Sequence, residues 1–400
     1  MGPRLDRVLI GIFGLVLAVV AAPALGQFGG GQFGGAEGPR VGREQMERYA
    51  ELLELDETQR EIAQMMLEDY IDGVQTAMDQ MREAAQQARQ EFEETRDRSA
   101  FADLREMGEQ TQERAQALED QLMGDLRSML TPEQEARWAS VERAHRRLTT
   151  LPRGLMSGER VDLFEIVRGL ELEGAAADEA QAVLGDYELA LDRALMARND
   201  MYEKGIELFR SRDFEALQSH FEDAREASIR VRDTHRTFAR RLEAVLPAEK
   251  LEAMETAVRR ASFPSVYREN RSDRAMAAVM GIEGLSEDQR GQIEAITLAT
   301  ERRMEQVNRR IADTIESNEV NMTIRDMMRG GRRGNEDGTR ELFAEKREVI
   351  ERAIEQLRSV LSEEQAAALE EAIGGSDEDG NAEPRRGAPQ RRQGGNRREL

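Results

Sequence analysis

The sequence predicts an all-α protein of tandem long antiparallel helical hairpins, in three repeats, with disordered N- and C-terminal segments. Three observations lead to this fold class. Apolar residues recur at steps of three and four over long stretches, as on one face of an α-helix. Only 4% of the residues are aromatic, against 34% charged, which suits amphipathic helices better than sheets. A helix-start pentapeptide also recurs along the chain.

Residues 1–26 have the pattern of a secretory signal peptide. Arg4 and Arg7 precede the apolar run from Val8 to Leu25, which ends in small residues just before Gln27. A basic region, an apolar region and a small-residue end in this order are typical of a cleaved signal. We therefore expect a periplasmic or secreted bacterial protein with no membrane span after signal removal. An uncleaved N-terminal anchor is the alternative, because the apolar run is near the minimum length for a span.

The first repeat is expected over residues 43–155, after a glycine-rich flexible spacer at residues 27–42. From Ile62 to Phe92 the apolar positions follow helical steps, which predicts one long helix. A second helix is expected from Phe101 to Met129. A third helix follows and carries Trp138.

Two further repeats are expected over residues 156–270 and 271–374. The stretch LELDETQREIAQMMLEDY (53–70) aligns without gaps on LELEGAAADEAQAVLGDY (170–187), and such self-similarity indicates an internal repeat. The third repeat contains RGGRRGNEDG (329–338), which we expect to form a flexible loop between its long helices. Residues 375–400 have no apolar periodicity and are expected to be disordered.

The recurring pentapeptide has the form of a helix start. In LTPEQ (130–134), Thr131 can cap the first backbone N–H groups, Pro132 fits the first helical position, and Gln134 can reach back to the cap. LDETQ (55–59), LSEDQ (285–289) and LSEEQ (361–365) repeat this spacing after a leucine that can pack as a hydrophobic staple. The helix-start residues are Leu55, Gln59, Leu130, Thr131, Gln134, Leu285, Ser286, Gln289, Leu361, Ser362 and Gln365.

The second repeat departs from this motif at both of its helix starts. Its end marker is LPAEK (246–250), which lacks the capping hydroxyl, and Gly174 stands where a capping serine or aspartate is expected. We therefore expect the helix ends of this repeat to fray more than those of the other two.

The composition argues against several classes of function. The net charge of −22 repels phosphate backbones, so we expect no nucleic-acid partner. The chain has no cysteine, and His145, His220 and His235 are isolated, so no metal site or cofactor is expected. No phosphate-binding glycine loop or nucleophile motif occurs, and we expect no enzymatic activity.

Methionine is abundant, with 19 residues against 12 phenylalanines. Flexible methionine side chains suit surfaces that repack around varied partners, but they also fill gaps in helical cores. For Met66, Met78 and Met81, which lie on the periodic apolar face, we expect the core role.

The paired helix starts, a leucine followed by threonine or serine and then glutamine at the two ends of a long helix pair, resemble the Spy/CpxP family of periplasmic proteins. The resemblance would cover residues 43 to about 374 as three tandem units. It implies an ATP-independent chaperone, a stress-response protein or a metal-responsive relative. In the chaperones of this family, a dimer forms a concave face that binds partly folded clients.

We therefore expect an exported, non-enzymatic protein that binds other proteins, either unfolded clients or envelope proteins. The alternative is a structural or spacer protein of the envelope, whose helices hold distance or self-associate as a homo-oligomer. A metal-responsive sensor is the least supported reading. An apolar or methionine-rich concave face would favour the first function, and fully charged surfaces would favour the second.

Overall fold

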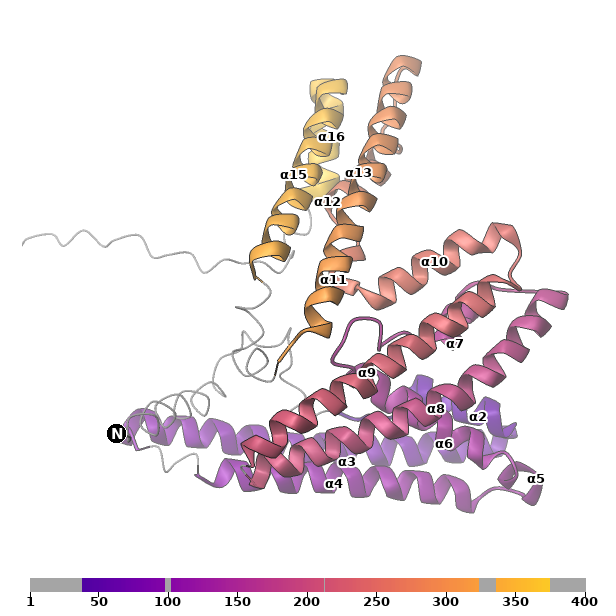
Figure 1. Cartoon of the computed structure of the whole chain (residues 1–400), viewed down its shortest axis with the longest axis vertical. Coiled ribbons are helices and arrows are strands. Elements are labelled where there is room, and N and C mark those ends of the chain that lie inside the picture. The colour runs from indigo at the N-terminus through magenta and orange to yellow at the C-terminus, as the bar shows by residue number, and fades with distance from the viewer. Residues whose placement is uncertain (1–37, 98–101, 212, 324–335, 375–400) are drawn as a thin grey trace, which may run out of the picture. The chain divides into compact units, whose positions relative to one another are not determined.

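The computed structural model describes residues 38–97, 102–211, 213–323 and 336–374, and its regular secondary structure over these ranges is helical (Figure 1). The all-α prediction is confirmed. The expected signal peptide, residues 27–37 of the expected spacer, residues 329–335 of the expected loop, and the expected tail at 375–400 lie outside the described residues. Residues 336–338 of that loop instead begin a helix, α15.

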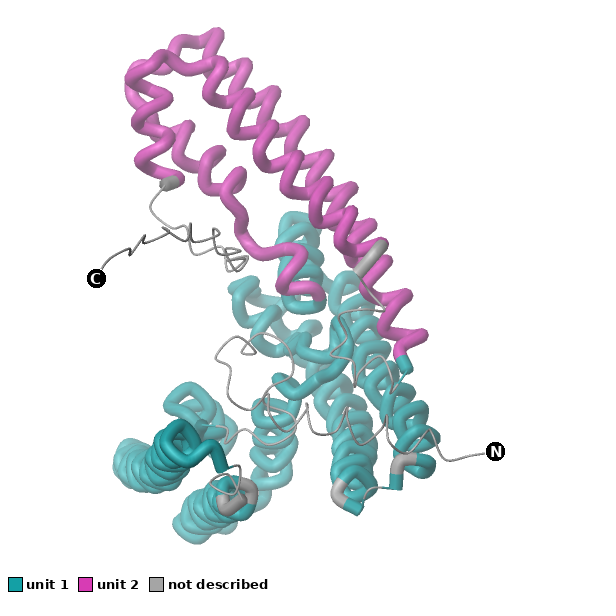
Figure 2. Tube along the Cα trace, turned by 90° about the vertical axis from the view of Figure 1, so that its left-hand side faces the viewer, with its two compact units in different colours: residues 1–262, 323–325 teal, residues 263–322, 326–400 magenta. Residues whose placement is uncertain are grey.

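The chain divides into two compact units (Figure 2). Unit 1 comprises residues 1–262 and 323–325, and unit 2 comprises residues 263–322 and 326–400. The unit boundary therefore falls before the expected repeat boundary at 270. The reason is Val266, which is fully buried in a core cluster of unit 2 with Met304 and Val307.

Unit 1 contains two pairs of long helices with shorter helices packed on them. Its elements are α2 (Arg43–Leu53), α3 (Glu57–Thr95), α4 (Ala102–Ser128), α5 (Pro132–Glu135), α6 (Trp138–Thr150), a 3-10 turn (Leu151–Arg153), α7 (Leu163–Gly169), α8 (Gly174–Ser211), α9 (Phe214–Glu243) and α10 (Ala248–Ser262).

The first helix pair, α3 and α4, packs along its length (Figure 1). From Ala63 to Ala77 every third or fourth residue of α3 is buried, including Leu67, Tyr70 and Val74, as its apolar spacing predicts. Gly73 allows a close approach, since a Cβ there would lie 2.9 Å from a Leu118 methyl. Tyr49 of α2 and Trp138 of α6 complete this core.

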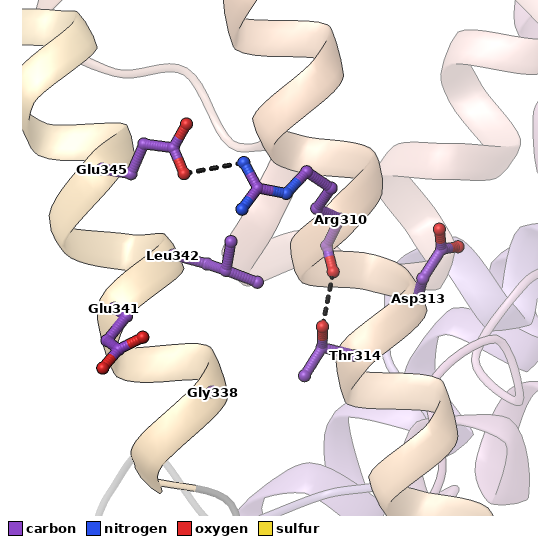
Figure 3. A pocket seen from close by; sticks show the side chains of 7 residues that line it. All are labelled: Arg310, Asp313, Thr314, Gly338, Glu341, Leu342 and Glu345. Carbon is purple, nitrogen blue, oxygen red and sulfur yellow. Dashed lines mark hydrogen bonds and ion pairs between the residues drawn. The ribbon is translucent and has the colours of Figure 1, made fainter.

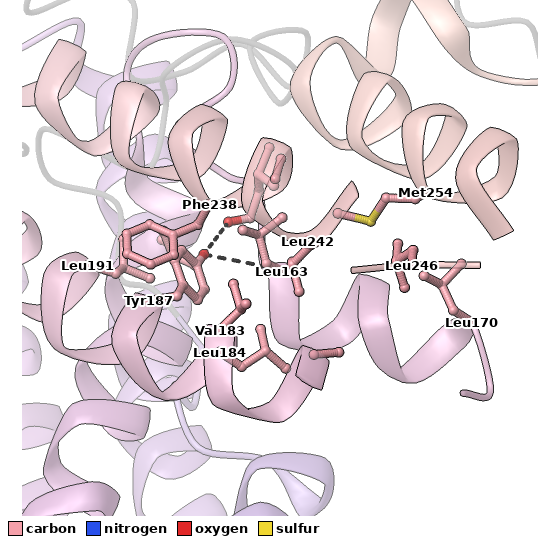
Figure 4. Packing of buried hydrophobic residues seen from close by; sticks show 14 of the residues in the cluster. Leu163, Leu170, Val183, Leu184, Tyr187, Leu191, Phe238, Leu242, Leu246 and Met254 are labelled. Atoms are coloured by element: carbon pink, nitrogen blue, oxygen red, sulfur yellow. Dashed lines mark hydrogen bonds between the residues drawn. The ribbon is translucent and has the colours of Figure 1, made fainter. Parts of the chain in front are cut away.

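The second helix pair, α8 and α9, has its own core (Figure 4). Tyr187, Leu191 and Leu195 of α8 are almost fully buried against Leu242 of α9. Met254 of α10 is fully buried in the same cluster. The spacing of three and four residues along α8 explains why one face of this helix enters the core.

Helix α6 connects the two pairs of unit 1 through ion pairs with α8 and α7. Arg143 donates to Glu188 of α8 at 2.9 Å, and Arg146 pairs with Asp192 one turn further on. Arg147 contacts Asp162, the N-cap of α7, at 3.0 Å. The side chains of these arginines are at most 30% exposed. Solvent therefore screens the attraction within these ion pairs less than it does between fully exposed charges.

Unit 2 contains the third helix pair, α13 and α15, which also packs along its length. Its core clusters place Ile293 and Ile311 of α13 near Ile354 and Leu342 of α15. The elements are α11 (Pro264–Tyr267), α12 (Arg271–Val279), α13 (Glu287–Val320), α15 (Glu336–Val360) and α16 (Glu363–Gly374).

Among the described residues, none of the helices is both long enough and apolar enough to cross a membrane.

Candidate functional site

The helix-start glutamines of the first pair form a cross-linked site at the base of α3 and α4. Gln59 and Gln134 each close a capping box, on Asp56 and Thr131 respectively. The two side-chain amides also bond to each other, with Nε2 to Oε1 distances of 2.9 and 2.8 Å. Each Nε2 lies 3.3 Å from a main-chain carbonyl as well, that of Met129 for Gln59 and that of Glu54 for Gln134. We call this arrangement the glutamine clasp.

The third pair has a similar clasp, in which one direct hydrogen bond joins the two side-chain amides. Gln289 and Gln365 close capping boxes on Ser286 and Ser362. Gln289 Nε2 donates to Gln365 Oε1 and to the carbonyl of Val360, both at 2.9 Å. Gln365 Nε2 lies 3.3 Å from the carbonyl oxygen of Gly284.

All four capping boxes predicted from the pentapeptides are present, and the structure brings them together in two pairs. The leucines before them divide into two kinds, because Leu55 and Leu285 are buried whereas Leu130 and Leu361 are half-buried. The sequence motif indicated the caps but contained no sign that the glutamines bond to each other, which depends on tertiary contact.

The second pair is closed without a clasp. Gly174 opens α8 with a positive φ of 57°, a conformation that disfavours most other residues. Apolar side chains meet where the clasp would stand, with Leu170, Leu246 and Met254 all buried in one cluster. This base is held by apolar burial rather than by a set of directed hydrogen bonds.

A short segment before each helix pair buries one valine, and polar side chains hold that segment. Val41, Val161 and Val266 are 0 to 1% exposed. The main-chain N–H of Arg40, within the expected spacer, donates to the Tyr70 hydroxyl at 2.9 Å. We call residues 38–42, 158–162 and 263–267 the lead-in segments.

The other two lead-in segments have comparable anchors. The Tyr187 hydroxyl lies 3.5 Å from both the carbonyl of Val161 and the N–H of Leu163. In unit 2, Lys346 Nζ donates to the carbonyl of Val266, and burial lowers the pKa of this lysine. Tyr70 and Tyr187 are the last residues of the two aligned stretches, 53–70 and 170–187. The alignment did not indicate that their hydroxyl groups anchor the lead-in segments.

A buried polar cluster lies beneath the second lead-in segment. Arg198 Nη1 lies 3.3 Å from Glu159 Oε1, and both side chains are fully buried. Arg198 also donates to the Thr150 carbonyl at 2.7 Å, while Glu159 accepts from the N–H of Met156 at 2.7 Å. Arg198 occupies a core position of α8. The sequence analysis missed this cluster, and its only sequence signal is a charged residue at an apolar position of the helical period.

The histidines make separate local contacts. His235 Nε2 lies 3.1 Å from the main-chain carbonyl of Glu159, and because a carbonyl can only accept, Nε2 donates this hydrogen bond. Nδ1 of the same ring then accepts from the Tyr187 hydroxyl. Burial lowers the pKa of His235 to about 4. His145 bridges the Tyr49 hydroxyl and the buried Glu119 carboxylate at 2.9 and 3.0 Å. His220 contacts the Met201 carbonyl.

The described residues contain no group of three or more histidine, aspartate or glutamate side chains arranged to hold a metal ion. A groove of about 490 Å³ lies between α13 and α15 (Figure 3). Among the side chains that line it, Arg310 pairs with Glu345 at 2.7 Å, and the Thr314 hydroxyl bonds to the Arg310 carbonyl.

Five methionines of the described ranges are buried, namely Met46, Met156, Met254, Met276 and Met304. Met66 and Met78 are half-buried against the first core cluster, as expected, and Met81 is half-buried. The large apolar side chains with the greatest exposure are distributed over all three helix pairs and the short helices beside them: Leu52, Met65, Leu189, Met196, Phe209, Met280, Leu298 and Val320.

Comparisons of this chain with protein-family models, with curated proteins and with solved structures give no match.

Proposed function

We propose that this chain is an exported, non-enzymatic protein that binds other proteins through three tandem hairpin units, and that it acts as an ATP-independent holdase of the Spy/CpxP-like kind. In this proposal the hairpins are the helix pairs α3 and α4, α8 and α9, and α13 and α15. The holdase would keep unfolded clients from aggregating by weak, reversible contacts at several surfaces.

Two relationships support the three-unit organisation. At the base of the first and of the third pair, a glutamine clasp joins two helix starts through Nε2 of one glutamine and Oε1 of the other. In addition, Trp138, Met254 and Leu369 each lie eight residues after the pentapeptide leucine of their unit, and all three are at most 5% exposed. Equal spacing and equal burial are expected when one structural unit is repeated.

The observation that carries the binding proposal is the exposure of large apolar side chains in every pair. Met65 on α3 is 58% exposed and Leu298 on α13 is 48% exposed, each within a strongly charged surface. Weak contacts of this kind gain strength when one client chain spans several of them, because the linked sites raise the effective concentration. A promiscuous binder needs such separated patches rather than one shaped pocket.

Light scattering from a denatured test protein tests this proposal. The chain from residue 27 onward should slow aggregation near stoichiometric ratio without nucleotide, and the double variant Met65→Glu/Leu298→Glu should do so less well. Gln110→Ala, at an exposed position on α4, is the matched control and should retain full activity. If the unmodified chain leaves aggregation unchanged at low and at physiological salt, the holdase proposal is wrong.

The second candidate is a structural or spacer protein of the envelope. The extensive ion pairing between α6 and α8 favours it, because a stiff connection between helix pairs suits an element that holds distance. A chain without effect on aggregation that assembles with envelope material in the native host would support this second function. A metal-responsive role ranks third, and calorimetry with zinc or copper would establish it by stoichiometric binding in the micromolar range.

A further inference from the structure

Three methionines are exposed to solvent in the described part of the chain. Met65, Met196 and Met280 are 58%, 52% and 58% exposed, whereas the other methionines of those ranges are buried or half-buried. The same three are the most exposed large apolar side chains among the described residues. Because the sequence contains no cysteine, methionine also supplies all of the sulfur of this chain.

Each of the three proposed units carries one of these methionines. Met65 lies on α3, Met196 lies on α8, and Met280 is the C-cap residue of α12. Two of them have a shielded methionine close by in the sequence. Met66 is half-buried against the first core cluster, and Met276, one turn before Met280, is only 9% exposed. These neighbours allow one residue type to be compared at two exposures.

The chemistry that distinguishes methionine from the other apolar residues is oxidation of its thioether, which requires that the oxidant reach the sulfur. With hydrogen peroxide, a lone pair of the sulfur attacks one peroxide oxygen, so that an S–O bond forms and the O–O bond breaks. The second oxygen leaves as hydroxide and takes the proton of the newly bound oxygen. The products are methionine sulfoxide and water, the sulfur having lost the two electrons that peroxide gains.

We propose that Met65, Met196 and Met280 are sites of reversible oxidation to methionine sulfoxide, and that their oxidation weakens the binding of clients. The second half of this inference rests on the holdase function proposed above. A sulfoxide is polar and retains water, so it contributes less than a thioether when a client covers it. Methionine sulfoxide reductases restore the thioether, one enzyme for each sulfoxide epimer.

The distribution of the methionines suits a reversible change rather than damage to the fold. Met254 and Met276 are buried in the cores of the second and third helix pairs, where a polar sulfoxide would disrupt the packing. Burial shields them, so oxidation at the surface leaves these cores intact. A leucine at the three exposed positions would offer similar apolar area without reacting with peroxide, whereas methionine makes that area depend on the oxidant.

Peptide mass mapping of the chain from residue 27 onward, after brief treatment with hydrogen peroxide, tests the sites. Each oxidised methionine gains one oxygen, about 16 Da. Met65 should oxidise about tenfold faster than Met66, and Met280 about tenfold faster than Met276. Both members of each pair lie in one tryptic peptide, so fragment spectra must locate the oxygen.

The same chain unfolded in urea is the control, and there the two members of each pair should oxidise at equal rates. Equal rates within both pairs in the folded chain, with its helical circular dichroism retained, would overturn the assignment of the sites.

Light scattering from a denatured test protein, before and after peroxide treatment, tests the effect on clients. The oxidised chain should slow aggregation less than the untreated chain, and treatment with both reductases and a thiol reductant should reverse this loss. In the matched control, Met65→Leu/Met196→Leu/Met280→Leu, peroxide should not change the activity that the variant has before treatment. If the triple variant loses as much activity as the unmodified chain, the client switch is wrong.

Failure of this inference and failure of the holdase proposal give different results. A chain that slows aggregation equally before and after oxidation of the three sites would keep the holdase function and overturn the client switch. A chain that oxidises selectively at the three sites but never slows aggregation would confirm the sites and contradict the holdase proposal together with the switch.

Discussion

Gln59 and Gln134, 75 residues apart, bond to each other through both side-chain amides at 2.9 and 2.8 Å. Each glutamine also closes the capping box of its own helix, so the start of α3 and the start of α5 are fixed by one set of four hydrogen bonds. The first backbone N–H groups of a helix have no hydrogen-bond partner within that helix. Here the two glutamines provide partners at both helix starts.

The clasp should act as a coupled unit. Gln59→Ala and Gln134→Ala should each lower the free energy of unfolding by about 1–2 kcal/mol, because each leaves a partly buried amide without its partner. The double variant should cost less than the sum of the two, by about 0.5–1 kcal/mol. Urea unfolding measures all three, with Gln110→Ala as control. Strict additivity would mean that the amide pair contributes nothing.

Thr131→Ala isolates the capping function of the pentapeptide. The Thr131 hydroxyl accepts from the Gln134 N–H at 3.3 Å, and its loss should cost about 1 kcal/mol of stability. The ability to slow client aggregation should not change. A variant of normal stability that loses client binding would show that the pentapeptide is a recognition element instead.

The buried pair of Arg198 and Glu159 should be sensitive to removal of one partner. Arg198→Met leaves a carboxylate in a fully buried position and should cost about 3–5 kcal/mol. Adding Glu159→Gln should recover part of the loss, since the uncompensated charge is removed. Thermal unfolding compares the two variants, and a double variant that is less stable than Arg198→Met would contradict the argument.

His235 should make stability depend on pH in mildly acidic solution. Its pKa falls from the ordinary 6.5 to about 4 in the folded chain, so the unfolded chain binds the extra proton first as pH falls. The contribution is therefore present above pH 6.5 and is lost between pH 6.5 and 4, with a total of about 3 kcal/mol.

The variant His235→Phe isolates this effect. Urea unfolding at several pH values should show a smaller loss of stability between pH 6.5 and 4 for the variant than for the unmodified chain. Thr131→Ala retains the histidine and should keep the original pH dependence despite its lower stability. Parallel curves for His235→Phe and the unmodified chain would show that the ring does not titrate as argued.

The base of the second helix pair should open more readily than the other two. Amide hydrogen exchange should be faster in the first turns of α8 than in those of α3 and α13, because Gly174 provides no capping side chain and no clasp joins the pair there. Equal protection at all three helix starts would show that the burial of Leu170 and Leu246 compensates fully.

Much of the architecture follows from short-range pattern. The period of three and four residues predicts α3 and α8 because a helix has 3.6 residues per turn, and the spacing of Thr131 and Gln134 predicts a cap because both groups belong to one helical turn. These features depend on neighbours in the chain, so they can be derived without knowledge of the fold.

Other features depend on which distant segments meet, and they became visible only in the folded chain. The partner of Gln59 is 75 residues away, and Val161 is buried only because Tyr187 and its helix lie over it. The charge on Arg198 is tolerable only where Glu159 and the Thr150 carbonyl surround it. Helical periodicity specifies which face of a helix is apolar, whereas tertiary packing decides what covers that face, and on α8 it leaves the side chains of Leu189 and Met196 about half exposed.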